Sequence, residues 1–274
     1  MHRFLLALYT VANLATTCIA LDLAVSSKIT TTMSLNPKKI FVFGATGKTG
    51  QRVVDQLQDK GLRVMAGVRD LNRAKETLGA EGDLLEFVKV DLEKDSTATL
   101  AKQLVGCDGV VCATGFSPSG FPPDPAGAIK VDYLGTKKIT NACTNAGVPK
   151  MVVVTSLLTN GILAGQALNP QFVLLNLFGG VLFAKRAAEI YIEDQANLDF
   201  TIVRPGGLKN DPPSGEIVFG SQDTIFGGGI SRDQVATVVV EALYSEKASN
   251  KIVEIVAKPD ALGISCEEGF ASIM

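Results

Sequence analysis

The sequence predicts an α/β fold, a single doubly wound domain with a mostly parallel sheet of about seven strands. Three observations lead to this prediction. Strand-like apolar runs alternate with helix-like segments, a glycine-spaced turn joins the first run to the first helix, and 274 residues, 46% of them hydrophobic, suffice for one large core. Such alternation requires right-handed crossovers, which place a ligand at the carboxyl ends of the strands.

The first strand is expected at Ile40–Phe43, an apolar run without polar alternation, as in strands buried on both faces of a parallel sheet. Gly44, Gly47 and Gly50 space the turn that follows, before the amphipathic segment Gln51–Lys60. Bare amides beside a helix N-terminus suit a diphosphate: Gly44 makes the turn, Gly47 admits the phosphates and Gly50 lets helix and strand pack closely. The spacing differs from the G-x-G-x-x-G dehydrogenase fingerprint, so glycines that serve packing alone are the alternative.

The second strand, Leu62–Val68, ends in Arg69 and Asp70, at the position where dinucleotide folds meet the adenosine ribose. An acidic residue there suits the two ribose hydroxyls of NAD, whereas a guanidinium forms a forked pair with a 2′-phosphate. Because Arg69 comes first, we expect NADP(H) rather than NAD(H). A solvated arginine at a strand end is the alternative, as is competition from Asp70 for the ribose.

The remaining elements follow in the same alternation. Further strands are expected at Leu85–Val90, Gly109–Ala113, Met151–Ser156, Phe200–Val203 and Lys251–Val256, with helices at Thr97–Leu104, Lys130–Ala146, Leu182–Gln195 and Arg232–Tyr244. Two long connections, Phe116–Ala128 and Gly206–Gly229, are expected to carry substrate contacts, with plain surface loops as the alternative.

Gln171–Ala184 is apolar nearly all round, yet too short to span a bilayer. We expect it to form a buried helix or a wall of the substrate pocket. Peripheral contact with a membrane surface or a lipid droplet is the alternative.

Charge and composition exclude several classes of function. The net charge of −2 provides no basic footprint, so we do not expect nucleic-acid binding. His2 is the sole histidine and lies in the expected leader, which leaves the mature domain without a histidine base or a histidine metal ligand. Cys107, Cys112, Cys143 and Cys266 lack paired zinc spacing and are expected to be small buried hydrophobes.

Residues 1–36 are expected to be a targeting leader that precedes the nucleotide-binding domain, residues 37–274. His2 and Arg3 form a short basic start, Phe4–Ala20 is apolar, and Cys18–Ala20 has the small-x-small form of a cleavage site. A Ser/Thr-rich stretch with several lysines follows. A signal-like segment before a transit-like one predicts a plastid reached through the secretory route, with secretion as the alternative.

Six segments carry a resemblance to a known family. They are FVFGATGKTG at Phe41–Gly50, AGVRD at Ala66–Asp70, VCATGF at Val111–Phe116, VDYLGT at Val131–Thr136, TIVRPGGLKNDPPSG at Thr201–Gly215 and ISRDQVATVVVEAL at Ile230–Leu243. With them the chain resembles the atypical short-chain dehydrogenases/reductases, NAD(P)-binding Rossmann proteins of the NmrA-like and flavin-reductase-like kind. Within this family it is most similar to plant chloroplast proteins related to the redox-sensing subunit of the inner-envelope import machinery.

The resemblance implies cofactor contacts at matched positions near the carboxyl ends of the strands. They are Thr46, Lys48 and Thr49 for the diphosphate; Asp91 and Leu92 for the adenine; Ala113, Thr114 and Gly115 for the ribose and diphosphate; and Thr155, Ser156, Arg204, Pro205, Gly206 and Gly207 around the nicotinamide.

The catalytic set implied by the resemblance is incomplete. Classical members place a tyrosine and a lysine four apart on one helix, so that the ammonium lowers the pKa of the phenol, which then exchanges a proton with the substrate. Lys185 matches the lysine, Ser156 the serine, and Asp132 stands where an asparagine would be, but Val181 occupies the tyrosine position. We therefore keep Ser156 and Lys185 as catalytic candidates and expect Lys185 to bind ribose hydroxyls, with a plain helix-surface lysine as the alternative.

Two functions fit these observations. In the first, NADPH passes hydride to a small-molecule acceptor that needs little acid catalysis from the protein, such as a flavin, a quinone or a tetrapyrrole-like pigment. In the second, the chain is a non-catalytic NADP(H) sensor or scaffold whose loops change partner affinity with cofactor occupancy. Whether the chain is an enzyme stays open at this point, since the missing tyrosine favours the second function.

Overall fold

A computed structural model of the chain describes residues 38–117, 124, 126–177 and 179–273. The expected leader lies outside the described residues, as does most of the proline-rich part of the Phe116–Ala128 connection. Lys38–Met274 forms one unit by its internal contacts.

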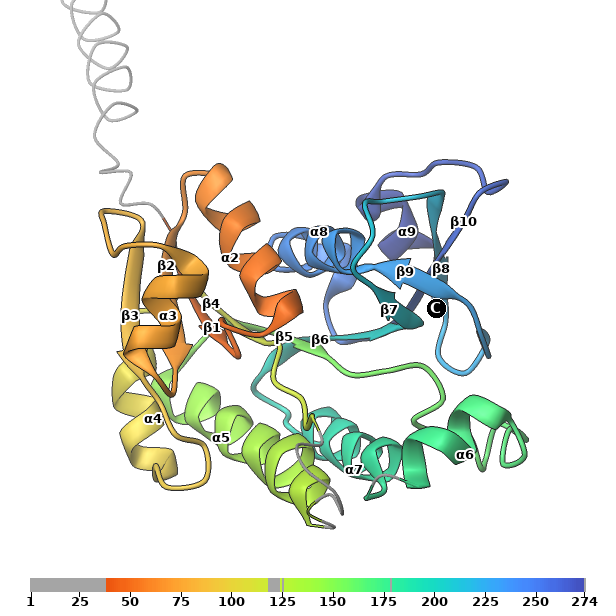
Figure 1. Cartoon of the computed structure of the whole chain (residues 1–274), viewed down its shortest axis with the longest axis horizontal. Coiled ribbons are helices and arrows are strands. Elements are labelled where there is room, and N and C mark those ends of the chain that lie inside the picture. The colour runs from red at the N-terminus through yellow and green to blue at the C-terminus, as the bar shows by residue number, and fades with distance from the viewer. Residues whose placement is uncertain (1–37, 118–123, 125, 178, 274) are drawn as a thin grey trace, which may run out of the picture. The chain divides into compact units, whose positions relative to one another are not determined.

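Among the described residues, ten strands form one sheet in the order β3-β2-β1-β4-β5-β6-β10-β9-β7, with β8 paired to β10 (Figure 1). The strands are β1 Lys39–Phe43, β2 Arg63–Val68, β3 Leu85–Lys89, β4 Gly109–Cys112, β5 Lys150–Val154, β6 Asp199–Pro205, β7 Gly207–Lys209, β8 Glu216–Gly220, β9 Gly229–Ser231 and β10 Lys251–Lys258. The pairs from β3 to β10 along this order are parallel, whereas β8 and β9 pair antiparallel with β10. The strand order reverses between β1 and β4, and doubly wound folds bind ligands at this point.

The seven expected strands are present, and the predicted doubly wound, mostly parallel α/β fold is confirmed. The expected count of about seven was too low. Strands β7 and β8 lie in the connection Gly206–Gly229, which we had expected to be a loop, and β9 begins at its last residue. β8 pairs with the edge of β10 opposite β6, whose backbone donors and acceptors would otherwise lack partners.

Helices cover both faces of the sheet (Figure 1). They are α2 Lys48–Asp59, α3 Leu71–Leu78, α4 Thr97–Leu104, the π-helix η1 Ile129–Gly135, α5 Thr136–Ala146, α6 Pro170–Leu177, α7 Val181–Glu193, α8 Arg232–Ala242, the 3₁₀ turn η2 Glu246–Ala248 and α9 Cys266–Ser272. In the view of Figure 1, α2 and α8 lie above the sheet, and α4, α5 and α7 lie below it.

Each face of the sheet has its own apolar core, and β1 contributes to both. Ile40 and Val42 pack with α2 and α8, whereas Phe41 and Phe43 pack with α4 and α5. Because successive side chains of a strand point to opposite faces, a strand buried on both sides is apolar throughout. This double burial explains the absence of polar alternation in the first strand.

The apolar segment Gln171–Ala184 forms α6 and the start of α7, and α6 is not a buried helix. Phe172 is its only buried residue, while Leu177 is 72% exposed. No helix within the described ranges is long and apolar enough to cross a bilayer.

Candidate functional site

The glycine turn packs so closely that two of its glycines are required by the fold. Gly44 has φ +77°, and a Cβ built there would lie 2.8 Å from the carbonyl oxygen of Ala113. A Cβ on Gly50 would lie 2.1 Å from the carbonyl oxygen of Gly44. A Cβ on Gly47 would meet only that same oxygen, at 3.1 Å. The fold therefore excludes side chains at Gly44 and Gly50, whereas a Cβ at Gly47 would be crowded by a single oxygen atom.

The first turn of α2 presents backbone amides that no side chain caps. Its N-cap, Gly47, has no side-chain cap bond, and no acidic residue lies in the first turn. Lys48 is exposed and Thr49 is buried beside it, while the carbonyl of Thr46 accepts a hydrogen bond from Gln51 at 2.9 Å. Uncapped amides and the positive end of a helix dipole attract an anion, so this turn fits the diphosphate of a dinucleotide.

The end of β2 places Arg69 and Asp70 in different roles. Asp70 is the N-cap of α3, and its Oδ1 accepts hydrogen bonds from the backbone N–H groups of Asn72 (2.9 Å) and Arg73 (3.2 Å). Arg69 is exposed, and no ion pair involves it among the described residues. One oxygen of Asp70 is thus occupied in holding α3, and the guanidinium of Arg69 is available to a ligand.

The turn after β3 holds the two residues expected near the adenine. Asp91 Oδ1 accepts the N–H of Glu93 at 3.1 Å, and Leu92 lies against Gly135. Lys138 Nζ donates to the carbonyl oxygens of Leu92 (2.7 Å), Asp95 (3.0 Å) and Glu93 (3.2 Å), so it fixes the turn from α5. Sequence reasoning missed Lys138, because its partners are main-chain carbonyls and leave no motif.

The segment Ala113–Gly115 follows β4 and lies beside an ion pair. Ala113 extends the sheet by donating to Phe43 at 3.0 Å, and the Thr114 hydroxyl lies 3.2 Å from Cys112 Sγ. A Cβ built on Gly115 would lie 3.7 Å from Asp132 Oδ1 and 3.8 Å from Lys185 Nζ. The carboxyl end of β4 therefore brings the expected ribose position next to both charged groups.

Lys185 is not a plain surface lysine. Its Nζ lies 2.9 Å from Asp132 Oδ1, and the two side chains are 13% and 1% exposed. Asp132 Oδ2 accepts the N–H of Phe116 at 3.2 Å, while Oδ1 has no aligned hydrogen-bond donor among the described residues. Asp132 belongs to the π-helix η1, and such irregular turns occur frequently at functional sites.

The position expected for a catalytic tyrosine holds a valine, as the sequence indicates. Val181 is the first residue of α7, one turn before Lys185. The hydroxyl of Tyr191 donates to Asn141 at 2.6 Å, and the ring of Tyr133 lies 5.9 Å from the ammonium of Lys137. Neither tyrosine replaces the missing phenol by sequence spacing.

Arg204 is fully buried in a cluster of carboxylates. Its Nε and Nη2 donate to Glu189 at 3.0 and 2.7 Å, and its Nη1 donates to Asp223 (2.8 Å) and Glu254 (3.2 Å). Burial alone would lower the pKa of this guanidinium, but the bonds to Glu189 and the charges of Glu189 and Asp223 outweigh burial and raise it. The Thr155 hydroxyl also donates to Glu189, at 2.7 Å. The side chains of Thr155 and Arg204 are thus engaged within this cluster.

The same cluster fixes the loops around the site. Glu189 accepts the hydroxyl of Thr159 at 2.9 Å, which holds the chain beyond β5. Glu254 accepts the N–H groups of Asp223, Thr224 and Ile225 at 2.9, 3.0 and 2.7 Å, which holds the loop between β8 and β9. Sequence reasoning missed both glutamates, although an acid within the apolar strand KIVEIVAK is a signal that could have indicated Glu254.

A pocket of about 390 Å³ opens at the carboxyl ends of β5 and β6. Its lining residues are Ser156, Leu157, Leu158, Gln171, Leu174, Leu175, Pro205, Gly206, Gly207, Leu208 and Arg232. Leu158 adopts a left-handed conformation (φ +64°), and such backbone strain clusters at functional sites. The α6 segment is thus a wall of this pocket, which also contains Ser156 and the expected nicotinamide residues Pro205–Gly207.

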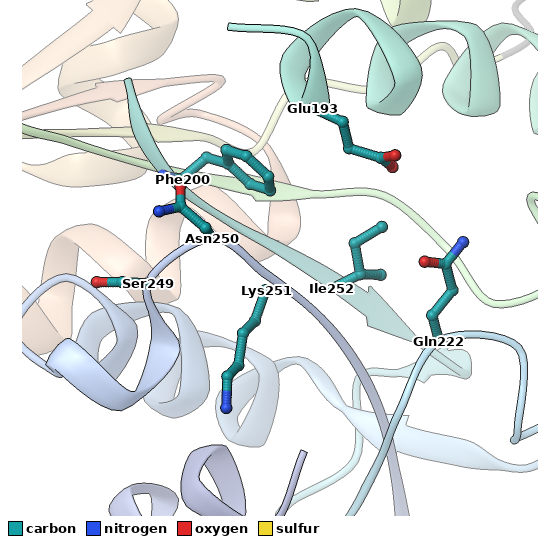
Figure 2. A pocket seen from close by; sticks show the side chains of 7 residues that line it. All are labelled: Glu193, Phe200, Gln222, Ser249, Asn250, Lys251 and Ile252. Atoms are coloured by element: carbon teal, nitrogen blue, oxygen red, sulfur yellow. Dashed lines mark hydrogen bonds between the residues drawn. The ribbon is translucent and has the colours of Figure 1, made fainter. Parts of the chain in front are cut away.

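A second pocket, of about 320 Å³, lies at the opposite edge of the sheet (Figure 2). Phe200 lines it near the start of β6, Lys251 at the start of β10 and Glu193 at the end of α7. The Lys251 ammonium donates to the carbonyl of Phe270 at 3.0 Å and points away from Glu193 (Figure 2). Since ligands of doubly wound folds bind at the carboxyl ends of the strands, the first pocket is the candidate site.

Comparisons with known proteins agree with this geometry. Residues 44–246 match the model of an NAD(P)H-binding family. An uncharacterized chloroplastic protein of Arabidopsis thaliana is 48% identical over 88% of this chain and 84% of its own length. Protein TIC 62, chloroplastic, of Arabidopsis thaliana is 35% identical over 83% of this chain, which spans only 37% of that longer protein.

Among solved structures, an oxidoreductase from Lactococcus lactis matches with a TM-score of 0.69 and 22% identity, over 85% of this chain and 95% of its own. This structural likeness shows a shared fold. Together with the family match across the glycine turn and the helices that follow it, the comparisons establish that the chain belongs to the NAD(P)H-binding family of Rossmann-fold proteins.

Proposed function

We propose that the chain is an NADP(H)-dependent oxidoreductase that passes hydride to a flat, largely apolar acceptor such as a flavin, a quinone or a pigment. The observation that carries the proposal is the pocket of about 390 Å³ next to the expected nicotinamide position, with leucines from the β5 loop and from α6 in its walls. Ligand sites of this kind are mostly apolar with a few placed polar groups.

The residues at the mouth of the first crossover fit a dinucleotide. The uncapped amides of α2 would hold the diphosphate, and Gly47, which has no side chain, would let it approach them. Arg69, exposed after β2, would pair with a 2′-phosphate, which supports NADP(H) over NAD(H). The carboxylate of Asp70 is partly occupied by capping α3, which reduces its competition for the ribose.

The Lys185–Asp132 pair would orient the nicotinamide end of the cofactor. Beside Gly115, the ammonium of Lys185 is positioned to donate to ribose hydroxyls, and Asp132 Oδ1 is positioned to accept from one. Bound NADPH would supply the hydride. Without a phenol at Val181, the proton that follows the hydride would come from water, so acceptors that need strong acid catalysis are excluded from the proposal.

Purified chain tested with NADPH against flavins, quinones and bilins checks the proposal. Loss of NADPH absorbance with one of these acceptors, and slower loss with NADH, is the expected result. Tight NADPH binding without turnover on any acceptor would instead support the second function, a non-catalytic NADP(H) sensor or scaffold, which Val181 in place of tyrosine favours.

We also propose a plastid location reached through a cleaved leader. Relatives that carry the label chloroplastic and the transit-like composition of the first 36 residues support it. A fluorescent protein fused behind residues 1–37 should accumulate in plastids, whereas export of the fusion would support secretion.

A further inference from the structure

Arg232 is a cation in an otherwise uncharged pocket. It is the first residue of α8, and of the described residues that line the pocket it alone carries a charge. The opposite wall belongs to the segment Leu157–Ala184, whose sequence contains no charged residue. Nothing in that wall therefore neutralises the guanidinium.

The described contacts of Arg232 are with neutral oxygens. Its Nη1 donates to Asn210 Oδ1 at 2.7 Å and to the carbonyl oxygen of Leu208 at 3.4 Å. The adjacent acid, Asp233, lies 3.0 Å from Nε of Arg52. Burial, followed by the charge of Arg52, lowers the pKa of the Arg232 guanidinium, as expected for a cation whose charge is not compensated.

The positive charges of some other arginines in the fold are balanced by ion pairs with carboxylates. Arg204 is paired with three carboxylates, and Arg63 pairs with Glu86 at 3.1 Å. Arg232 differs because, among the described residues, only its Nη1 has hydrogen-bond partners, which leaves the remaining N–H donors of its planar fork for a ligand. A carboxylate is the ligand group that matches such a fork with two parallel hydrogen bonds.

We propose that Arg232 binds a carboxylate of the acceptor, so that the acceptor is an amphiphile with a flat apolar body and an acidic side chain. The apolar body would lie against Leu157, Leu158, Leu174 and Leu175, and the acid would reach across the pocket to α8. This inference rests on the proposed acceptor pocket and adds the charge of its ligand. A phosphate of the cofactor would also match this guanidinium, and the experiment distinguishes a carboxylate of the acceptor from a phosphate of the cofactor.

The test measures binding rather than turnover, on the full chain. The probes are biliverdin and biliverdin dimethyl ester, which share a flat body but differ in their carboxylates. Each is titrated by its absorbance with NADP+ present, which cannot donate a hydride, and NADPH is titrated separately without the probes. Arg232→Gln is compared with Arg232→Lys and with Arg63→Gln, a control whose arginine is paired with Glu86 outside the pocket. Melting temperatures confirm that each variant is folded.

The wild type should bind the acid about tenfold or more tightly than the ester. Arg232→Gln should abolish this difference, Arg232→Lys should keep part of it, and Arg63→Gln should leave it unchanged; NADPH affinity should stay constant throughout. Equal binding of acid and ester by the wild type, failure of both probes to bind, or a loss confined to NADPH would each overturn the proposal. Binding with this pattern, together with no oxidation of NADPH by any of the flavins, quinones and bilins, would refute the proposed reductase and leave the carboxylate site standing.

Discussion

Replacing Gly47 by alanine separates cofactor binding from packing in the glycine turn. Gly47 has φ −76° and ψ 157°, a conformation that alanine adopts freely, and its built Cβ meets only the Gly44 oxygen at 3.1 Å. Alanine is a poorer N-cap than glycine, but it lowers the entropy of the unfolded chain, so the two effects largely cancel. We expect the free energy of unfolding to change by less than about 1 kcal/mol.

The methyl group of the alanine would also block access to the backbone amides that are expected to bind the diphosphate. We therefore expect Gly47→Ala to weaken NADPH binding by about tenfold or more, a loss of at least about 1.4 kcal/mol. Gly50→Ala provides the contrast, because its Cβ would lie 2.1 Å from the backbone oxygen of Gly44 and would force α2 away from β1. That variant should lose about 3 kcal/mol or more of stability.

Denaturant unfolding and fluorescence titration with NADPH, applied to the same preparations, measure the two effects. Gly82→Ala is the matched control, since nothing lies within 4 Å of a Cβ at Gly82. Unchanged NADPH affinity in Gly47→Ala would refute the reasoning, because the glycines would then serve packing alone.

Three further predictions concern charged groups. Arg69→Asp should weaken the binding of NADPH by about 1.5–3 kcal/mol more than the binding of NADH. Equal losses of affinity in the two titrations would show that Arg69 does not contact the 2′-phosphate. Lys185→Met should cost about 3–5 kcal/mol of stability, because the Asp132 side chain is 1% exposed and would be left unpaired. Adding Asp132→Asn to this variant should recover most of that loss in urea unfolding. Additive losses from the two substitutions would contradict the pairing. Glu189→Gln should lower the free energy of unfolding by about 3 kcal/mol or more, since it breaks the buried bidentate pair with Arg204. Glu193→Gln, whose side chain is 35% exposed, should change the melting temperature little. Similar effects of the two variants would show that the buried cluster contributes no more to stability than a surface ion pair.

The parallel part of the fold could be predicted because its strands and helices are marked by patterns within short stretches of sequence. Strands β1, β2, β4 and β5 are short, mostly apolar runs between turn residues, and α4 has the predicted bounds Thr97–Leu104. Strands β7 and β9 contain three residues each and are held by pairing with distant strands, so no periodicity marks them.

The candidate site could be predicted in its backbone but not in its side-chain contacts. Glycine spacing indicated the turn after β1, and the structure gives Gly44 and Gly50 the expected close approaches. The pairing of Lys185 with Asp132 and the burial of Arg204 among carboxylates join residues far apart in the sequence. Spacing within one element carries no information about such contacts, so the resemblance alone placed Arg204 beside the nicotinamide.

The central claim is that the opening of the first crossover binds a dinucleotide through its diphosphate and its 2′-phosphate. Calorimetric titration of the purified chain with NADPH and with NADH tests this claim most directly. We predict saturable binding of both, with NADPH bound more tightly and this preference lost in Arg69→Asp. Absence of binding by either nucleotide would contradict the account of the cofactor site and, with it, the proposed reductase and the alternative sensor.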